Sequence, residues 1–74
     1  MNIQVRLFAG FRTGRFSRRE MDLPDGTTLH DLVVQLEIEP TDVSLPLING
    51  KYGDLDRLLS DGDIASLFPN VAGG

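Results

Sequence analysis

The sequence contains neither cysteine nor tryptophan, and it has only one histidine and one tyrosine. The absence of cysteine excludes disulfides, Cys-ligated zinc sites and iron–sulfur clusters. No apolar run approaches the roughly 18 residues that a membrane span needs, and residues 1–4 lack signal-peptide character. We therefore expect a cytoplasmic protein without a membrane partner.

Catalytic motifs are also missing. No serine stands in a motif with the histidine, and residues 10–14 lack the consecutive Lys-Ser/Thr pair of a phosphate-binding loop. His30 has no second ligand or nucleophile beside it, so we interpret it as a solvated helix residue. The chain (1–74) makes one domain, which at this length buries only about 60% of its unfolded surface. We expect no catalytic site of its own, no metal and no permanently bound cofactor.

The net charge is −4, but the charges are unevenly distributed. Every acidic residue lies in 20–74, and five arginines precede them all: Arg6, Arg12, Arg15, Arg18 and Arg19. Such asymmetry can mark two binding faces. Nucleic acid is not an expected partner, because the overall balance is acidic and the aromatics do not alternate with the arginines. We interpret the arginines as part of a solvated hairpin.

Hydrophobic periodicity predicts an opening hairpin. Ile3, Val5 and Leu7 alternate with polar residues, which indicates a half-buried strand over 2–9 and leaves Phe8 on the polar face. A turn over 10–14 and a returning strand over 15–23 follow.

A helix is predicted next. Thr28 and Asp31 have the spacing of a capping box, in which each side chain satisfies a backbone N–H at the helix start. An apolar stripe follows at helical spacing, and Pro40 sets its end. The stripe consists of Leu29, Leu32, Val33 and Leu36.

The second half reads as three short strands and a turn. Residues 45–48 form an apolar strand, Asn49-Gly50 predicts a tight hairpin, and 51–52 return from it. Residues 54–59 are expected to make a single helical turn over one end of the core. The last strand covers 64–68.

The C-terminal segment carries the most specific signal. Gly73 and Gly74 lack a Cβ, so their backbone can pass through a channel too narrow for side chains. The ending Phe68-Pro69-Asn70-Val71-Ala72-Gly73-Gly74, after Asp61-Gly62-Asp63, closely resembles that of the MoaD/ThiS family of ubiquitin-like sulfur carriers. Asn70 stands where the family commonly has a second proline.

The resemblance implies an α+β, β-grasp (ubiquitin-like) fold. In this fold a mixed sheet of four to five strands packs on one main helix, and the first and last strands lie side by side. A flexible C-terminal Gly-Gly tail (69–74) follows the last strand.

The resemblance also implies a chemistry. An E1-like adenylyltransferase (MoeB/ThiF type) uses ATP to adenylate the Gly74 carboxylate, with Gly73 beside it. A sulfur donor such as a cysteine desulfurase or rhodanese then converts that carboxylate into a thiocarboxylate. An acceptor enzyme then uses the sulfur. In this chemistry the chain is a substrate of its partner enzymes and not an enzyme itself.

A partner-binding surface is implied as well. Phe8 and Phe68 are expected on the exposed face of adjacent strands, with Ile64 on that face and Tyr52 near it. Two exposed phenylalanines side by side mark a docking patch, whereas a single one does not. The residues assigned to partner binding are Phe8, Tyr52, Ile64, Phe68, Pro69, Val71 and Ala72.

Several acceptors fit this ending. The Phe68-Pro69-x-Val71-Ala72 context favours the molybdopterin branch, whose acceptor is the synthase large subunit (MoaE type). A ThiS-like carrier serving thiazole synthase, a carrier for cysteine synthesis and a tungsten-pathway homologue share Gly73-Gly74. Two readings from other classes are a ubiquitin-like modifier joined to lysines and a plain interaction module, whose function would survive removal of the two glycines.

Overall fold

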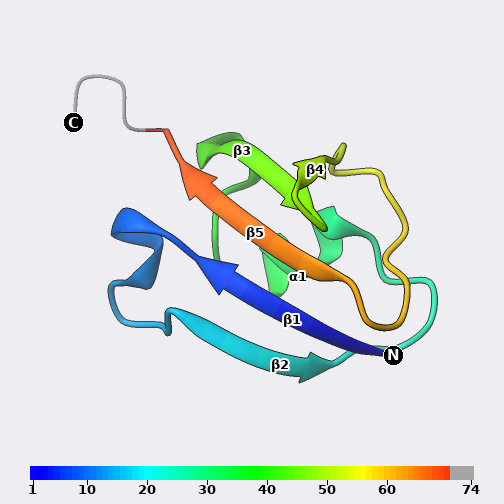
Figure 1. Ribbon diagram of the computed structural model, residues 1–74. Helices are drawn as coiled ribbons and strands as arrows, with labels where there is room; N and C mark the ends of the chain where they lie inside the picture. The colour runs from blue at the N-terminus through cyan, green and yellow to red at the C-terminus, as the bar shows by residue number, and fades with distance from the viewer. Residues whose placement is uncertain (71–74) are drawn as a thin grey trace.

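Five strands form one mixed sheet in the order β2-β1-β5-β3-β4, with one α-helix against a single face of it (Figure 1). The computed structural model describes residues 1–70. Its elements are β1 (Asn2–Leu7), the 3-10 helix η1 (Ala9–Arg12), β2 (Arg18–Asp22), α1 (Leu29–Gln35), the 3-10 helix η2 (Pro40–Asp42), β3 (Val43–Ile48), β4 (Lys51–Tyr52) and β5 (Ile64–Pro69). The predicted α+β class and mixed sheet of four to five strands are confirmed, and this is the β-grasp arrangement.

The first and last strands lie side by side at the centre of the sheet. β1 and β5 run parallel, and the remaining neighbours, β1 with β2, β3 with β5 and β3 with β4, run antiparallel. The expected adjacency of the first and last strands is therefore correct. It places the residues just before the C-terminal tail beside the end of β1.

Alternation along the central strands separates a buried inner face from an outer face. Side chains at successive strand positions point to opposite sides, so Ile3, Val5 and Leu7 share one side and are fully buried. Ala65 and Leu67 of β5 lie on that side too and are also fully buried. The inner face packs on α1 through its apolar stripe, in which Leu29, Leu32 and Val33 are fully buried.

The helix begins as predicted. The Thr28 hydroxyl accepts a hydrogen bond from the Asp31 N–H, and the Asp31 carboxylate accepts one from the Thr28 N–H, both at 3.1 Å. Glu37, two residues beyond the end of α1, has a φ of 60°. The chain leaves the helix there, before Pro40.

The segment after β1 differs from the predicted turn. Residues 9–12 form η1, and Phe11 is buried in the core at 7% exposure. The returning strand is shorter than predicted, since β2 begins at Arg18. Phe16 precedes β2 and packs partly on the core, which explains why it is out of phase with Met21 and Leu23. Loop residues that fill a core by tertiary contact have no periodicity to reveal them.

The predicted helical turn over 54–59 is wrong. A single hydrogen-bonded turn, with the Arg57 N–H donating to the Asp54 carbonyl, is followed by an extended segment. Leu58 forms an isolated bridge with Thr28 and is 61% exposed, whereas Leu59 is buried. Backbone hydrogen bonds to Thr27, Leu29 and His30, at the start of α1, hold this segment in place, and local sequence does not encode such distant partners.

Two turns join the sheet at one end. Asn49 and Gly50 have φ values of 54° and 81°, as the predicted tight hairpin requires. The buried Asp63 carboxylate accepts hydrogen bonds from Asn49 Nδ2 at 2.9 Å and from the Ser60 N–H at 2.8 Å. The Asp61 carboxylate accepts from the Asn2 N–H at 2.7 Å. The Asp61-Gly62-Asp63 turn thus ties the start of β5 to β1 and to the β3–β4 hairpin.

Candidate functional site

The outer face of the sheet carries an apolar patch beside the base of the C-terminal tail. Paired residues of neighbouring strands point to the same side. Leu45 pairs with Phe68 and Leu47 pairs with Ser66, so both leucines lie on the outer face. Phe8 and Phe68 stack on this face. We call Phe8, Leu45, Leu47 and Phe68 the outer patch.

The two phenylalanines form its centre. Their ring centroids are 4.1 Å apart and their planes differ by 10°. The Phe8 N–H donates to the Leu67 carbonyl at 3.2 Å, which aligns the end of β1 with the end of β5. Both side chains are half-buried, so part of each ring remains available to a partner. The expected adjacency of the two rings is present, while their role in partner binding stays a prediction.

Sequence reasoning did not assign Leu45 and Leu47 to the patch. Leu45 is 41% exposed and Leu47 is half-buried. An apolar run such as 45–48 does not show which residues face water. The pairing register of β3 with β5 determines which of these side chains face outward. A bulge between Val43 and Leu45 turns Val43 toward the core instead.

The other predicted partner residues lie around the patch. Tyr52 is 63% exposed and pairs with Leu47, so it belongs to the outer face at the β4 edge. Ile64 shares the outer face but begins β5, four positions and roughly 13 Å before Phe68. Pro69 ends β5 opposite Val43 and is half-buried. Ile64 therefore does not adjoin the phenylalanine pair.

Four predicted site residues lie outside the described part of the chain. They are Val71, Ala72, Gly73 and Gly74. The described chain ends at Asn70, whose N–H donates to the Asp42 carbonyl at 3.0 Å. The outer patch is thus placed directly before the segment that carries the proposed reacting carboxylate.

An arginine-lined pocket adjoins the outer patch at the β2 side. It measures about 430 Å³ and is lined by Arg6, Phe8, Arg12, Ser17 and Arg18, and we call it the arginine pocket. The Arg12 guanidinium carbon stands 5.3 Å from the Phe8 ring centroid, within range of a cation–π interaction.

The interpretation of the arginines as a solvated hairpin is therefore incomplete. Arg12 Nε donates to the Leu7 carbonyl at 2.8 Å, and Arg15 donates to carbonyls beyond the end of α1. These guanidinium groups therefore also stabilise the fold by hydrogen bonding. Sequence composition does not show that an arginine will bind a backbone carbonyl.

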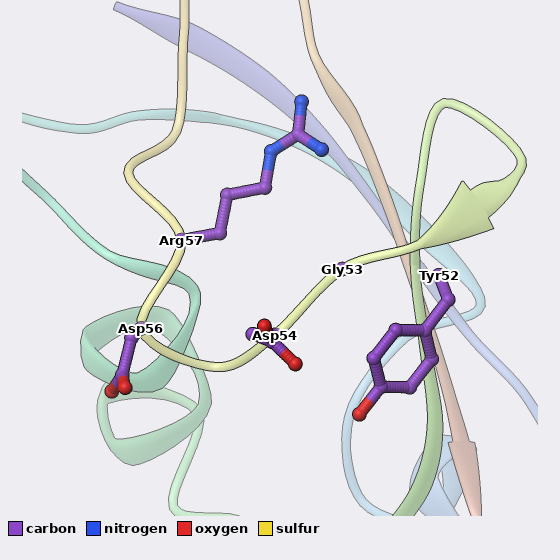
Figure 2. Close-up of a pocket in the computed structure, with 5 residues that line it drawn as sticks. All are labelled: Tyr52, Gly53, Asp54, Asp56 and Arg57. Atoms are coloured by element: carbon purple, nitrogen blue, oxygen red, sulfur yellow. The ribbon is translucent and has the colours of Figure 1, made fainter.

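The opposite edge of the sheet carries charges of both signs, since Lys51 of β4 and Arg57 accompany Asp54 and Asp56. Figure 2 shows a second pocket, of about 450 Å³, lined by Tyr52, Gly53, Asp54, Asp56 and Arg57. In this view the two carboxylates and the Tyr52 ring point to one side and the Arg57 guanidinium points away from them. The arginine pocket is thus lined by charges of one sign, whereas the β4 edge carries both.

Within residues 1–70 no cluster of three or more His, Cys, Asp or Glu side chains could hold a metal ion. No helix in that range has the length and apolar character needed to cross a membrane. Hydrogen bonds from the Thr28 backbone and side chain lower the pKa of Asp31. Asp31 lies in the first turn of α1, on the inner side of the sheet, so this pKa shift arises from helix capping.

Known proteins resemble the chain over nearly its full length. The ThiS family model matches residues 5–74, and no curated protein matches. The putative molybdopterin converting factor, subunit 1, from Pyrococcus furiosus is 28% identical with a TM-score of 0.77, covering 96% of this chain and 99% of the other.

Two further structures extend the comparison. A chain from the complex of subunits 1 and 2 of the molybdopterin-converting factor of Helicobacter pylori is 26% identical with a TM-score of 0.64, and both chains are covered completely. Small archaeal modifier protein 1 of Haloferax volcanii has a TM-score of 0.77 at 23% identity, covering 95% of this chain and 98% of the other. The last likeness concerns the fold alone.

Proposed function

Because the chain belongs to the ThiS family of ubiquitin-fold sulfur carriers, we propose that it carries sulfur on the Gly74 carboxylate for molybdopterin biosynthesis. The observation that carries this proposal is the family match over residues 5–74, which includes the terminal Gly73-Gly74 pair. The likeness to a putative molybdopterin converting factor subunit, over nearly the whole of both chains, supports this choice of pathway.

Gly74 is the reacting residue in this role. A free carboxylate is a poor electrophile, so an E1-like adenylyltransferase joins it to the α-phosphate of ATP and releases pyrophosphate. The outer sulfur of a persulfide on a cysteine desulfurase or rhodanese then displaces AMP, and a thiol reduces the resulting acyl disulfide to release the thiocarboxylate on Gly74. The resulting thiocarboxylate is a far better nucleophile at neutral pH than the original carboxylate.

The outer patch is proposed to provide affinity that the two glycines cannot. Glycine has no side chain to contact a partner, whereas burying each phenylalanine contributes on the order of 1.5 to 3 kcal/mol. We propose that the activating enzyme and a large subunit of the MoaE type dock on this patch. The Helicobacter pylori relative occurs in a complex of subunits 1 and 2, which supports a large-subunit partner.

Intact-mass spectrometry tests the carrier role. The full chain and a variant lacking Gly74 are each incubated with ATP, a sulfur source and the host's activating enzyme. We expect a gain equal to the replacement of one oxygen by sulfur in the full chain alone. An unchanged mass, with an enzyme shown to act on another carrier, would contradict the proposal.

A second assay separates the pathways. The thiocarboxylated chain is offered to a molybdopterin synthase large subunit and to thiazole synthase, and loss of sulfur from the chain is followed by mass. Turnover with thiazole synthase alone would assign a ThiS-like role. The fold shared with small archaeal modifier protein 1 keeps protein modification as a further candidate, which isopeptide conjugates to lysines would reveal.

A further inference from the structure

The arginine pocket concentrates positive charge in an acidic protein. Arg6 and Arg18 are directly paired across β1 and β2, and Arg12 comes from η1. Like charges placed opposite each other destabilise an antiparallel strand pair. A bound anion between these groups would remove that repulsion.

The described chain supplies no such anion. Within residues 1–70 the one ion pair joins the Met1 amino group to Asp22 at 3.5 Å, at the other end of the β1–β2 pair. Glu20 lies on the outer face of β2, yet it forms no ion pair with Arg6 or Arg18. Among the described residues the pocket therefore has no counter-ion.

The guanidinium groups are held in position for binding. Arg6 Nε donates to Gln4 Oε1 and Arg12 Nε donates to the Leu7 carbonyl, both at 2.8 Å. These bonds occupy Nε, so in the described chain both Nη groups of each remain for another acceptor. A side chain already fixed loses less entropy on binding, and two parallel N–H groups match the two oxygens of a carboxylate.

We propose that the arginine pocket binds a carboxylate-rich segment of the protein that docks on the outer patch. Phe8 lines the pocket and also belongs to the outer patch, so one continuous segment can place acidic side chains on the arginines and apolar ones on the rings.

A peptide fits this surface better than a nucleic acid does. The net charge of −4 opposes a long polyanion, and the apolar Phe8 ring lines the pocket. The inference rests on the proposed function in one respect only, which is that the docking protein is identified as an enzyme that acts on the Gly74 carboxylate.

NMR titration of the isotope-labelled full chain tests the pocket directly. The probes are a capped glutamate peptide with one central phenylalanine, the same peptide with lysine replacing glutamate, and inorganic phosphate. We expect the glutamate peptide alone to shift the amides of residues 6–8, 12 and 17–18. Raising the salt to about 1 M, where charges are screened beyond about 3 Å, should abolish the shifts.

Two neighbouring substitutions give a matched pair. Arg18→Gln and Arg19→Gln remove the same charge from adjacent positions of β2, but Arg18 lines the pocket while Arg19 stands on the inner side, 4.4 Å from the Phe16 ring centroid. We expect Arg18→Gln to weaken glutamate-peptide binding up to about fivefold, the range of an exposed ion pair, and Arg19→Gln to leave it unchanged.

Three results would overturn the inference. Equal loss in both variants would indicate attraction by overall charge, and no loss in either would exclude the pocket. Tighter binding of phosphate than of the glutamate peptide would assign a phosphate site instead. Since none of these measurements requires sulfur transfer, their failure is distinguishable from failure of the carrier role.

Discussion

At the residue scale, Gly53 shows how closely the β4 connection packs on the core. The glycine is buried directly after Tyr52, and an added Cβ would stand 2.7 Å from Ile48 Cγ1. Ile48 is 1% exposed, so it has little room to move away. This contact fixes the backbone that presents Tyr52 at the edge of the sheet.

We expect Gly53→Ala to lower the free energy of unfolding by about 1 to 3 kcal/mol, the usual cost of overpacking. Chemical denaturation measures this change. Gly10→Ala is the matched control, because an added Cβ at Gly10 meets nothing within 4 Å. Equal stability of the two variants would show that the Ile48 contact relaxes without cost.

Asp31 makes the start of α1 sensitive to pH. Hydrogen bonds from the Thr28 backbone and side chain lower the Asp31 pKa below its ordinary value of 3.8. A carboxyl whose pKa is lower in the folded state contributes stability above the unfolded value, and this contribution is lost as pH falls through the folded pKa.

We therefore expect Asp31→Asn to lower stability at neutral pH but to have a smaller effect in acid. Urea midpoints of both proteins at about pH 2.5 and about pH 6 test this, since these values bracket the titration of a carboxyl group. A constant difference between the two proteins at both pH values would contradict the assignment to the ionised carboxylate.

At the scale of elements, α1 is a short helix stabilised by groups from outside it. The carbonyl groups just beyond its C-terminal end have no partner within the helix, and its last turn contains no basic residue. Arg15, from the segment between η1 and β2, donates through Nε to the Leu36 carbonyl and through Nη2 to the Glu37 carbonyl, both at 3.0 Å. Its positive charge also suits the negative end of the helix dipole.

We expect Arg15→Gln to lower the free energy of unfolding by about 1 to 2 kcal/mol, because two or three hydrogen bonds are lost. Thermal unfolding measures the effect. Arg18→Gln removes the same charge from a side chain that makes no hydrogen bond in the described chain and that faces Arg6, so it should not lower stability. Similar losses in both variants would assign the effect to net charge.

At the scale of the whole molecule, the parallel pairing of β1 and β5 unites docking and chemistry. It stacks Phe8 on Phe68 directly before the segment that carries Gly74. The same topology brings the arginine pocket to the β2 side of the outer patch. In the proposed function, apolar contact at the outer patch holds the partner and the arginine pocket orients it.

We expect Phe68→Ala to weaken binding of the activating enzyme by about tenfold, because it removes buried apolar surface from the interface. The domain should stay folded, since Phe68 is only half-buried. Val34→Ala is the control: Val34 is 52% exposed on α1, which covers the opposite side of the sheet. Calorimetric titration of both folded variants with the activating enzyme measures the two affinities. An unchanged affinity of Phe68→Ala would show that the outer patch does not contribute to binding.

Local sequence determined the features that depend on near neighbours. Alternation predicted β1, helical spacing and the Thr28–Asp31 pair predicted α1, and Asn49-Gly50 predicted the hairpin, because each signal lies within a few residues. The terminal motif pointed to the family for the same reason, since its residues are contiguous.

Tertiary structure alone decided the features that join distant segments. Phe11 enters the core from a loop, Leu45 and Leu47 face outward because of the β3–β5 register, and three arginines meet only because η1, β1 and β2 converge. Residue periodicity describes one element at a time. Strand register, bulges and the meeting of separate elements arise from contacts between distant segments. The extent of the outer patch was therefore evident only in the folded chain.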